Sequence, residues 1–363
     1  MPITRVDLPD DALVATLPSP DYTTTYPQID GPYELPWWAV EAVEGAYAQR
    51  RFTGRTVRLY RLRRAFVCAE GLVFNADGQL FAPTAAQFGE DTITTAHRAV
   101  QQALFDRTIE EHAGPAVLCK RPTAYNYGHW MIDMLPGAHL AQAMLPDDVR
   151  RGFACLLHRT GGHMDGVMTE TLGRLGIGLP RLFWTGNAPV LCHDLFLLDG
   201  VSQHGRYITP HTLACHDRIA QGVQGRGWTR LFVTRTTGLG RVLRNEAALA
   251  EMAAAEGYFV FDPGRATIAE QIAAFRDARS VIGAIGAGLT NILYCAPGAK
   301  VTLMTPRSMP DSFYWLICAV RGLVYRDLRC HEVGPEAGPG MPPWMRDTEM
   351  EPDRFRAVLA ALG

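Results

Sequence analysis

The sequence predicts an α/β protein built from two domains with a cleft between them. Its 363 residues are too many for one ordinary hydrophobic core, and two domains of typical size fit this length. In the second half, short apolar segments alternate with segments of helical periodicity, which is typical of a parallel sheet covered by helices on both faces. A hydrophobic fraction of 47% with 20% charged residues indicates a soluble, globular protein.

The N-terminal half is predicted to begin with an arm that is rich in Pro, Tyr and Trp, followed by a short helix within residues 34–52. Residues 56–84 are expected to form strands, with a hairpin turn at Asn75–Gly78. The remaining elements of this half are strands at 153–158, 181–184 and 194–200 and a helix at 163–176.

The C-terminal half shows the strand–helix alternation most clearly. Strands are expected at 229–235, 258–262 and 280–284, and a turn followed by a strand at 296–304. Between them lie a helix at 245–257, with Asn245 as N-cap and Gly257 as its end, and a helix at 267–278 capped by Thr267. The tail is expected to be a Pro/Gly-rich linker followed by a last helix that packs back on the body. The predicted segments are therefore 1–215, 216–330 and 331–363.

The charge and cysteine content exclude several classes of protein. A formal charge of −2 argues against nucleic-acid and membrane-surface proteins, which usually carry a basic excess. The eight cysteines form no CxxC pair, and reduced, buried thiols are the expectation. Residues 1–22 lack the apolar core of a signal peptide, and no stretch approaches the ~18 apolar residues of a membrane span. We therefore expect a cytoplasmic protein, for which peripheral membrane contact and a homo-oligomer both stay open.

A glycine-rich turn between a strand and a helix invites two interpretations. Gly283, Gly286 and Gly288 follow the apolar strand 280–284, and Thr290 and Asn291 open the next helix. The turn could bind a phosphate at the helix N-terminus, or it could be small only so that helix and sheet pack closely. A dinucleotide site is disfavoured because the third glycine of GxGxxG is missing, and no Gly-Lys-Ser/Thr of a Walker loop is near.

Arginines follow the first strand of the same half. Arg235 ends the strand, and Arg241 and Arg244 come shortly after it. Because the carboxyl ends of parallel strands share one edge, these side chains could grip a diphosphate beside the glycine turn. The structural alternative is surface arginines paired with Glu246 and Glu251, with Asn245 as a helix cap.

These segments resemble glycosyltransferase family 61, whose bacterial members are often labelled capsular polysaccharide biosynthesis proteins. Residues 234–249 (TRTTGLGRVLRNEAAL) resemble its Arg, Arg, Asn-Glu pattern, and residues 268–301 resemble its Gln motif and glycine-rich signature. Residues 125–136 (YNYGHWMIDMLP) are similar to its Asn-Tyr-x-His-Trp helix with the following acid and Pro.

The resemblance implies a GT-B fold of two Rossmann-like domains. It also implies inverting transfer of a sugar from a nucleoside-diphosphate sugar, for which a UDP-sugar is the first candidate, with no essential metal or other cofactor. It implies an acceptor-side domain at 1–215, a donor domain at 216–330, and a glycan or glycoconjugate acceptor in bacterial surface polysaccharide assembly. The donor-binding residues that it implies are Arg235, Arg241, Asn245, Glu246, Gln271, Gly286, Ala287, Gly288, Thr290 and Asn291.

One position departs from the family pattern. The glycine signature usually has a histidine immediately before Gly286, and this chain has Ile285. An isoleucine cannot contact phosphate or sugar as a histidine does. An altered donor mode, another residue in the same role, and a non-catalytic sugar-nucleotide or glycan-binding relative are the resulting alternatives.

The acceptor side is expected to supply the base that inverting transfer needs. His129 and Asp133 are four residues apart at the start of a helix that Pro136 interrupts, so both project from one face. Either could be the base, or Asp133 could orient His129; the structural alternative is a half-buried histidine bonded to a main-chain carbonyl. Tyr125, Asn126 and Tyr127 are candidates for the acceptor side, as is Trp130, although core packing suits Trp130 better.

Overall fold

The computed structural model describes residues 3–106, 109–235, 241–334 and 342–362. By its internal contacts the chain divides into two compact units. Unit 1 consists of residues 1–20 and 54–203, and unit 2 of residues 21–53 and 204–363. This division differs from the expected segments, because residues 21–53 group with the C-terminal half and unit 2 resumes at His204 instead of residue 216.

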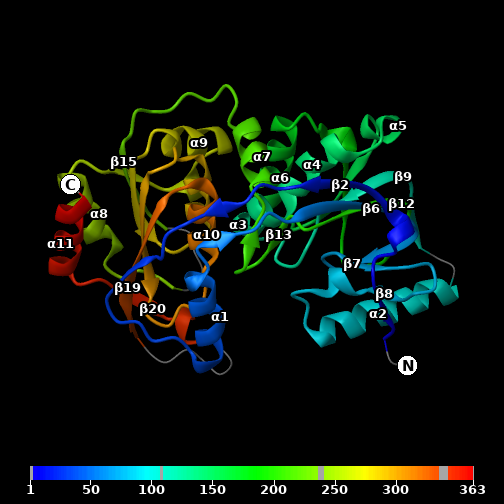
Figure 1. Ribbon diagram of the computed structural model, residues 1–363, viewed down its shortest axis with the longest axis horizontal. Coiled ribbons are helices and arrows are strands. Elements are labelled where there is room, and N and C mark those ends of the chain that lie inside the picture. Colours follow the sequence, from blue (N-terminus) through cyan, green and yellow to red (C-terminus); the bar gives the residue numbers. More distant parts are fainter. Residues whose placement is uncertain (1–2, 107–108, 236–240, 335–341, 363) are drawn as a thin grey trace. The chain divides into compact units, whose positions relative to one another are not determined.

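Unit 1 is built on a mixed sheet (Figure 1) with the strand order β1-β8-β7-β6-β12-β9-β10-β11, and β2 pairs with β6. Neighbours among β12, β9, β10 and β11 are parallel, whereas β12, β6, β7 and β8 pair antiparallel. The strands of this sheet are β1 (Arg5–Val6), β2 (Leu13–Pro18), β6 (Thr56–Cys68), β7 (Leu72–Phe74), β8 (Leu80–Phe81), β9 (Glu110–Leu118), β10 (Ala154–His158), β11 (Leu182–Thr185) and β12 (Val190–Asp199). The short strand β13 (Ser202–Gln203) of the unit lies outside it.

The helices of unit 1 cover this sheet and include one π-helical turn. They are α2 (Glu90–Asp106), α3 (Tyr127–His129), the π-helical turn η3 (Trp130–Met134), α4 (Leu135–Met144), α5 (Asp147–Arg150) and α6 (His163–Arg174), with short 3-10 turns at Asp10–Ala12, Ala82–Ala85 and Leu179–Arg181. Helix α2 buries Ile93, Ala96 and Val100 against Phe66 and Phe74 of the antiparallel strands. The predicted hairpin turn is confirmed, since the Gly78 N–H donates to the Asn75 carbonyl at 3.0 Å.

Unit 2 contains a sheet with the strand order β16-β15-β17-β18-β19-β20, and β4 pairs with β19. Every neighbouring pair is parallel except β19 with β20. The strands of the unit are β3 (Tyr22–Thr23), β4 (Gln28–Asp30), β5 (Arg51–Phe52), β14 (Tyr207–Ile208), β15 (Arg230–Val233), β16 (Phe259–Phe261), β17 (Ser280–Ala284), β18 (Lys300–Pro306), β19 (Val324–Val333) and β20 (Asp347–Glu349).

Helices cover the sheet of unit 2, as expected for strands that read as continuous apolar runs. They are α1 (Trp37–Ala48), α7 (His211–Ile219), α8 (Glu246–Ala255), α9 (Ile268–Arg276), α10 (Phe313–Arg321), α11 (Pro352–Leu362) and the 3-10 helices η5 (Pro263–Arg265), η6 (Ala287–Tyr294) and η7 (Pro343–Met345). Helices α8 and α11 lie side by side (Figure 1), and Phe355 of α11 packs on Phe232 of β15. The last helix therefore packs back on the body, as predicted.

The α/β class is confirmed, and so are several local predictions. Thr267 caps α9 in a capping box with Glu270, and all eight cysteines are buried free thiols. Two expectations are wrong. Pro136 does not end the helix: α3 is followed by the π-helical turn Trp130–Met134 and then by α4, in whose first turn Pro136 lies. The expected linker contributes His331–Val333 to β19 and Asp347 to β20, while residues 335–341 lie outside the described part of the chain.

Candidate active site

The carboxyl ends of β15 and β17 are neighbours at the strand-order switch of the unit 2 sheet. After β15 the chain adds β16 on one side of this strand and then returns to add β17 on its other side, and we call such a place a strand-order switch. Ligands of doubly wound sheets bind beyond the carboxyl ends of the strands at such a switch. Arg235 follows β15 here, and the glycine turn follows β17, so the topology brings together the two segments singled out in the sequence.

Arg235 lies directly against the glycine turn. A Cβ placed on Gly286 would come within 2.8 Å of Arg235 Cδ, so a larger residue at this position would displace the arginine. The main-chain N–H of Arg235 donates to both carboxylate oxygens of Glu246 at 3.1 Å, which fixes the backbone where β15 ends. Its Nη1 donates to the carbonyl of Arg241 at 3.2 Å. Residues 236–240, between the two arginines, lie outside the described part of the chain.

Arg241 is held in an unusual backbone conformation with a φ of 53°, which residues other than glycine seldom adopt. Its Nη1 lies 3.6 Å from the thioether sulfur of Met309, a weak acceptor. Its Nε is buried and has no hydrogen-bond partner among the described residues. Arg244 differs, because it forms an exposed ion pair with Asp347 at 3.3 Å and so fits the structural alternative of a surface arginine.

The electrostatics of this edge favour an anion. Burial lowers the pKa of Arg235, and the positive charge of Arg241 lowers it further. Burial also raises the pKa of Glu246. Two guanidinium groups close together in a half-buried position repel each other, and a diphosphate between them would relieve that repulsion through charge-assisted hydrogen bonds.

Several other residues predicted to bind the donor have structural contacts in the turn itself. Asn291 donates through Nδ2 to Gln271 Oε1 at 2.6 Å and to the Gly288 carbonyl at 2.9 Å. Gln271 in turn donates to the Ala266 carbonyl at 3.0 Å. Both amide side chains are buried, as is Thr290, whereas Ala287 and Gly288 are half-buried. The hydrogen bonds of Asn291 and Gln271 among the described residues therefore hold the glycine turn in shape.

Asn245 and Ile285 also have packing roles in the structure. Asn245 precedes α8 as predicted, but its side chain does not cap the helix. Instead, Nδ2 donates to the Met350 carbonyl at 2.7 Å and Oδ1 accepts from the Met350 N–H at 3.3 Å, which ties the C-terminal segment to α8. Ile285 is buried, and its N–H donates to the Met304 carbonyl at 2.9 Å. Its side chain therefore belongs to the apolar interior beside β18.

Unit 1 has a strand-order switch of its own between β9 and β12. The chain runs from β9 to β10 and β11 on one side, and β12 then returns to the other side of β9. The segment after β9 leads into α3 with His129, and Ser202 follows β12. The same topological rule therefore predicts that these two segments meet.

His129, Asp133 and Ser202 form a hydrogen-bonded chain at this switch. Nδ1 of His129 lies 2.8 Å from Oδ2 of Asp133, and the Ser202 hydroxyl donates to the other carboxylate oxygen, Oδ1. Asp133 is only 7% exposed, while the His129 side chain is 20% exposed. When the carboxylate accepts from Nδ1–H, the neutral imidazole carries its lone pair on Nε2, the arrangement of a general base.

The carboxyl group of Asp133 is held in its charged form in spite of its position. Burial alone would raise the pKa of Asp133, but the hydrogen bond and the charge of His129, the Ser202 hydroxyl and the charge of Arg121 together keep this pKa below its usual range. A buried, ionised carboxylate bonded to a histidine is suited to orienting the ring and stabilising its protonated form. Of the roles left open by the sequence, the geometry favours orientation by Asp133.

The residues predicted for the acceptor side separate into exposed and buried ones. Tyr125 is 64% exposed and Tyr127 is half-buried. Asn126 caps α3, because its side-chain oxygen accepts from the N–H of Gly128 at 2.8 Å and, more weakly, from that of His129. Trp130 is fully buried and donates to the Thr171 hydroxyl at 3.0 Å, so its prediction as an acceptor-side residue is corrected to core.

Two further residues of these sites were missed in the sequence. Ser202 bonds to Asp133, and the phenol of Tyr314 in α10 donates to the Gly286 carbonyl at 2.6 Å. Ser202 could have been found, since it follows a strand end just as Arg235 does. Tyr314 lies within an apolar helix, where no local pattern marks it.

Comparisons with known proteins agree with the sequence motifs. A family model described as Glycosyltransferase 61 matches residues 127–302, roughly half of the chain. The match includes His129, Asp133 and every predicted donor-binding residue. A search of curated proteins found no match. None of the helices in the described residues is long and apolar enough to cross a membrane.

Proposed function

Because this chain belongs to glycosyltransferase family 61, we propose that it transfers a sugar with inversion from a nucleoside-diphosphate sugar, a UDP-sugar, to a glycan or glycoconjugate acceptor. The proposal rests on the pair of arginines, Arg235 and Arg241, beside the glycine turn at the strand-order switch of unit 2. The biological setting that we propose is the cytoplasmic stage of bacterial surface polysaccharide assembly.

On the donor side, the departing diphosphate must be stabilised as its bond to the sugar breaks. The two guanidinium groups supply positive charge at the place where an anion is expected, so the proposed reaction needs no essential metal. Gly286 allows Arg235 to approach the turn, and the Tyr314 phenol fixes the Gly286 carbonyl. These contacts support a preorganised anion site on unit 2.

On the acceptor side, the acceptor hydroxyl must lose a proton as its oxygen attacks the anomeric carbon. We assign this proton to Nε2 of His129, with Asp133 orienting the ring and Ser202 orienting Asp133. The exposed ring of Tyr125 is a surface on which an acceptor sugar could stack. The proposal includes a GT-B arrangement, with donor binding by unit 2 and acceptor binding by unit 1.

The donor site is tested by measuring UDP affinity in matched arginine variants. Arg241→Met keeps the length of the side chain but removes its charge, and we expect a loss of UDP affinity of at least about tenfold, since charge-assisted hydrogen bonds are the stronger kind. Arg244→Met is the control, because Arg244 lies three residues after Arg241 in the sequence but forms an exposed ion pair with Asp347. Isothermal calorimetry reports both affinities. Equal affinity for UDP in wild type and Arg241→Met would place the donor elsewhere.

Ile285 supports a second candidate function, namely a sugar-nucleotide or glycan-binding relative that has lost catalysis. The buried isoleucine stands where the family pattern usually has a histidine, and it packs in the interior beside β18. Release of UDP from a UDP-sugar by the wild-type protein, in the presence of an acceptor, would exclude this candidate. Donor binding without release of UDP across a panel of acceptors would favour it.

A further inference from the structure

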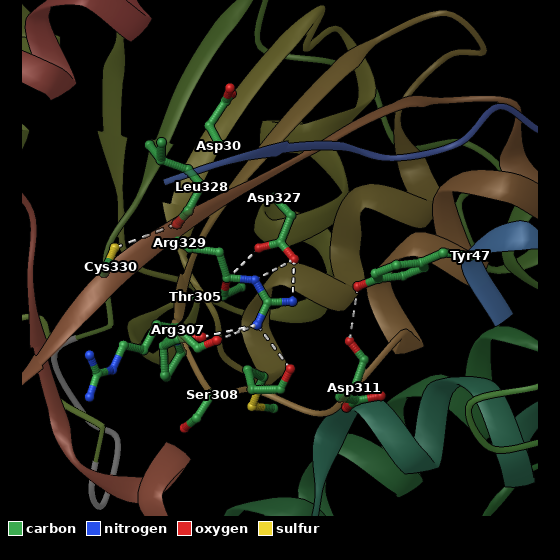
Figure 2. Close-up of polar contacts among 12 residues, drawn as sticks. Asp30, Tyr47, Thr305, Arg307, Ser308, Asp311, Asp327, Leu328, Arg329 and Cys330 are labelled. Carbon is green, nitrogen blue, oxygen red and sulfur yellow. Dashed lines mark hydrogen bonds and ion pairs between the residues drawn. The ribbon is translucent and has the colours of Figure 1, made fainter. Parts of the chain in front are cut away.

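The sheet of unit 2 contains a fully buried ion pair next to the proposed donor site. Asp327 and Arg329 are two residues apart on β19, so their side chains lie on the same face of the strand, and neither is exposed. Nε of Arg329 donates to Asp327 Oδ2 at 2.8 Å, and Thr305 donates to the other oxygen, Oδ1. Figure 2 shows this guanidinium between Asp327 and the chain that follows β18.

A buried ion pair is a poor source of stability. Removing two charges from water costs about as much as their attraction returns, and apolar residues of similar volume often stabilise a protein equally well. The contacts of Arg329 therefore point to a role in geometry. Its guanidinium also lies over the ring of Tyr33, with the central carbon 4.8 Å from the ring centre, so its plane is held from a second direction.

Arg329 shapes the segment Thr305–Met309, which forms the end of β18 and the turn after it. A single nitrogen, Nη1, faces the carbonyl oxygens of Pro306, Arg307 and Met309 at 3.1, 3.4 and 2.9 Å (Figure 2). Both the main-chain N–H and the hydroxyl of Ser308 donate to Glu332. Three carbonyl oxygens that point toward one place are stabilised by a positively charged donor between them, and the Arg329 guanidinium is that donor.

The same segment is in contact with the proposed donor site. Met309 Sδ lies 3.6 Å from Nη1 of Arg241, and Met304, just before the segment, accepts from the N–H of Ile285 in the glycine turn. A change in the path of residues 305–309 would therefore move the sulfur against which the Arg241 guanidinium rests. The buried pair and the donor-site arginine are connected through one short turn.

We infer that Asp327 and Arg329 are positioning residues for the donor: they hold the segment Thr305–Met309 in the shape that places the guanidinium of Arg241. The identity of the ligand in this inference rests on the proposed function, whereas the effect of the buried pair on the segment Thr305–Met309 and on Arg241 does not. The buried pair acts through Met309 and is not proposed to contact the donor.

The decisive variant replaces both charges together. Asp327→Asn with Arg329→Met keeps the volume and the acceptor for Thr305, and it leaves no buried charge without a partner. We expect a lower melting temperature, because the carbonyls of Pro306, Arg307 and Met309 lose their donor. We also expect hydrogen exchange to accelerate more at the amides of Ser308, Met309 and Arg241 than at amides elsewhere in unit 2, and UDP binding to weaken at least tenfold. Arg329→Lys keeps the charge but not the planar fork, so it should restore only part of the affinity.

The matched control removes a different ion pair of the same strand. Arg326 and Asp30 are paired at 3.0 Å. Within the described residues, the Arg326 side chain has no hydrogen bond or ion pair with the segment Thr305–Met309. Asp30→Asn with Arg326→Met should leave both the exchange rates and UDP affinity unchanged. Unchanged exchange at Ser308, Met309 and Arg241 in the Asp327/Arg329 variant would overturn the inference. Failure of the wild type to bind UDP would instead overturn the proposed donor, while the exchange rates would still decide the positioning role.

Discussion

In unit 1, the segment after β9 supplies an imidazole and a carboxylate, and the segment after β12 adds a serine hydroxyl; in unit 2, the segments after β15 and β17 bring two guanidinium groups to a glycine turn. Both places are strand-order switches, at the carboxyl ends of parallel strands. The position is thus set by topology, whereas the chemistry is set by the few residues that follow each strand. One edge can move a proton, and the other can hold an anion.

The two edges also differ in how their charged groups are satisfied. The carboxylate of Asp133 is buried and accepts from both His129 and Ser202. Arg241 in unit 2 has only the thioether of Met309 as side-chain partner for Nη1 and no partner for the buried Nε within the described residues. A group that is already satisfied can orient a neighbour. A cation with weak partners is suited to receive a ligand.

The largest effect expected from this comparison is on catalysis without an effect on donor binding. His129→Ala removes the proposed base, and general-base catalysis typically contributes about 10²–10⁴-fold to the rate. We expect kcat to fall by that order while UDP affinity, measured by calorimetry, stays at the wild-type value.

His193 provides a matched control for that experiment. It forms a histidine–carboxylate pair with Glu111 at 2.7 Å in the same unit, but the pair is on the surface and away from the switch. His193→Ala should leave kcat unchanged. If His129→Ala retained full turnover, the division of chemistry between the two edges would be wrong.

A second prediction concerns Lys120, a buried cation at the edge of unit 1 that is fully satisfied. Its ammonium donates to the Ala69 carbonyl at 2.7 Å and the Thr185 hydroxyl at 2.9 Å, and burial lowers its pKa to about 8 from an ordinary 10.5. Between these two values the unfolded chain binds more protons than the folded protein, so this group makes stability rise with pH. The rise amounts to roughly 3 kcal/mol over the window.

Lys120→Met removes this titration. In urea unfolding at pH 7.5 and pH 10, the free energy of unfolding of wild type minus that of the variant should therefore increase with pH. Lys300→Met, which replaces an exposed lysine, is the control. Parallel pH profiles for wild type and Lys120→Met would show that burial does not lower the pKa of the Lys120 amine. Lys120 would then no longer serve as the satisfied, buried counterpart of Arg241.

Part of this molecule could be predicted from local sequence because local physics determines it. The expected strand at 280–284 is observed as β17, since a short run that is buried on both faces must be mostly apolar. Thr267 and Glu270 form a capping box that is written within four residues. The meeting of Arg235 with the glycine turn follows from the rule that parallel strands share a carboxyl edge.

Other features depend on partners far along the chain, and local sequence does not specify them. The arm divides between the units, because β2 pairs with β6 and β4 pairs with β19, nearly three hundred residues away. Asn245 has the composition of a helix cap, but Met350 competes for its side chain. The Arg329 contacts with residues 306–309 arise from the neighbouring strand β18, so no motif announces them.

The smallest effect in the series concerns Gly286, and it separates a sterically required glycine from a merely exposed one. An added Cβ would meet Arg235 Cδ at 2.8 Å, so Gly286→Ala should push the arginine away from the turn and weaken UDP binding severalfold, to about tenfold. Stability should change little, because the φ of −178° suits alanine and the arginine can move. Gly45→Ala in α1 is the control, since no atom lies within 4 Å of its Cβ. This control should stabilise the helix by roughly 0.5–1 kcal/mol and leave UDP affinity unchanged. If Gly286→Ala bound UDP as tightly as wild type, close approach of Arg235 to the turn would not matter for the anion, and Arg241 alone would distinguish the edge of unit 2 from that of unit 1.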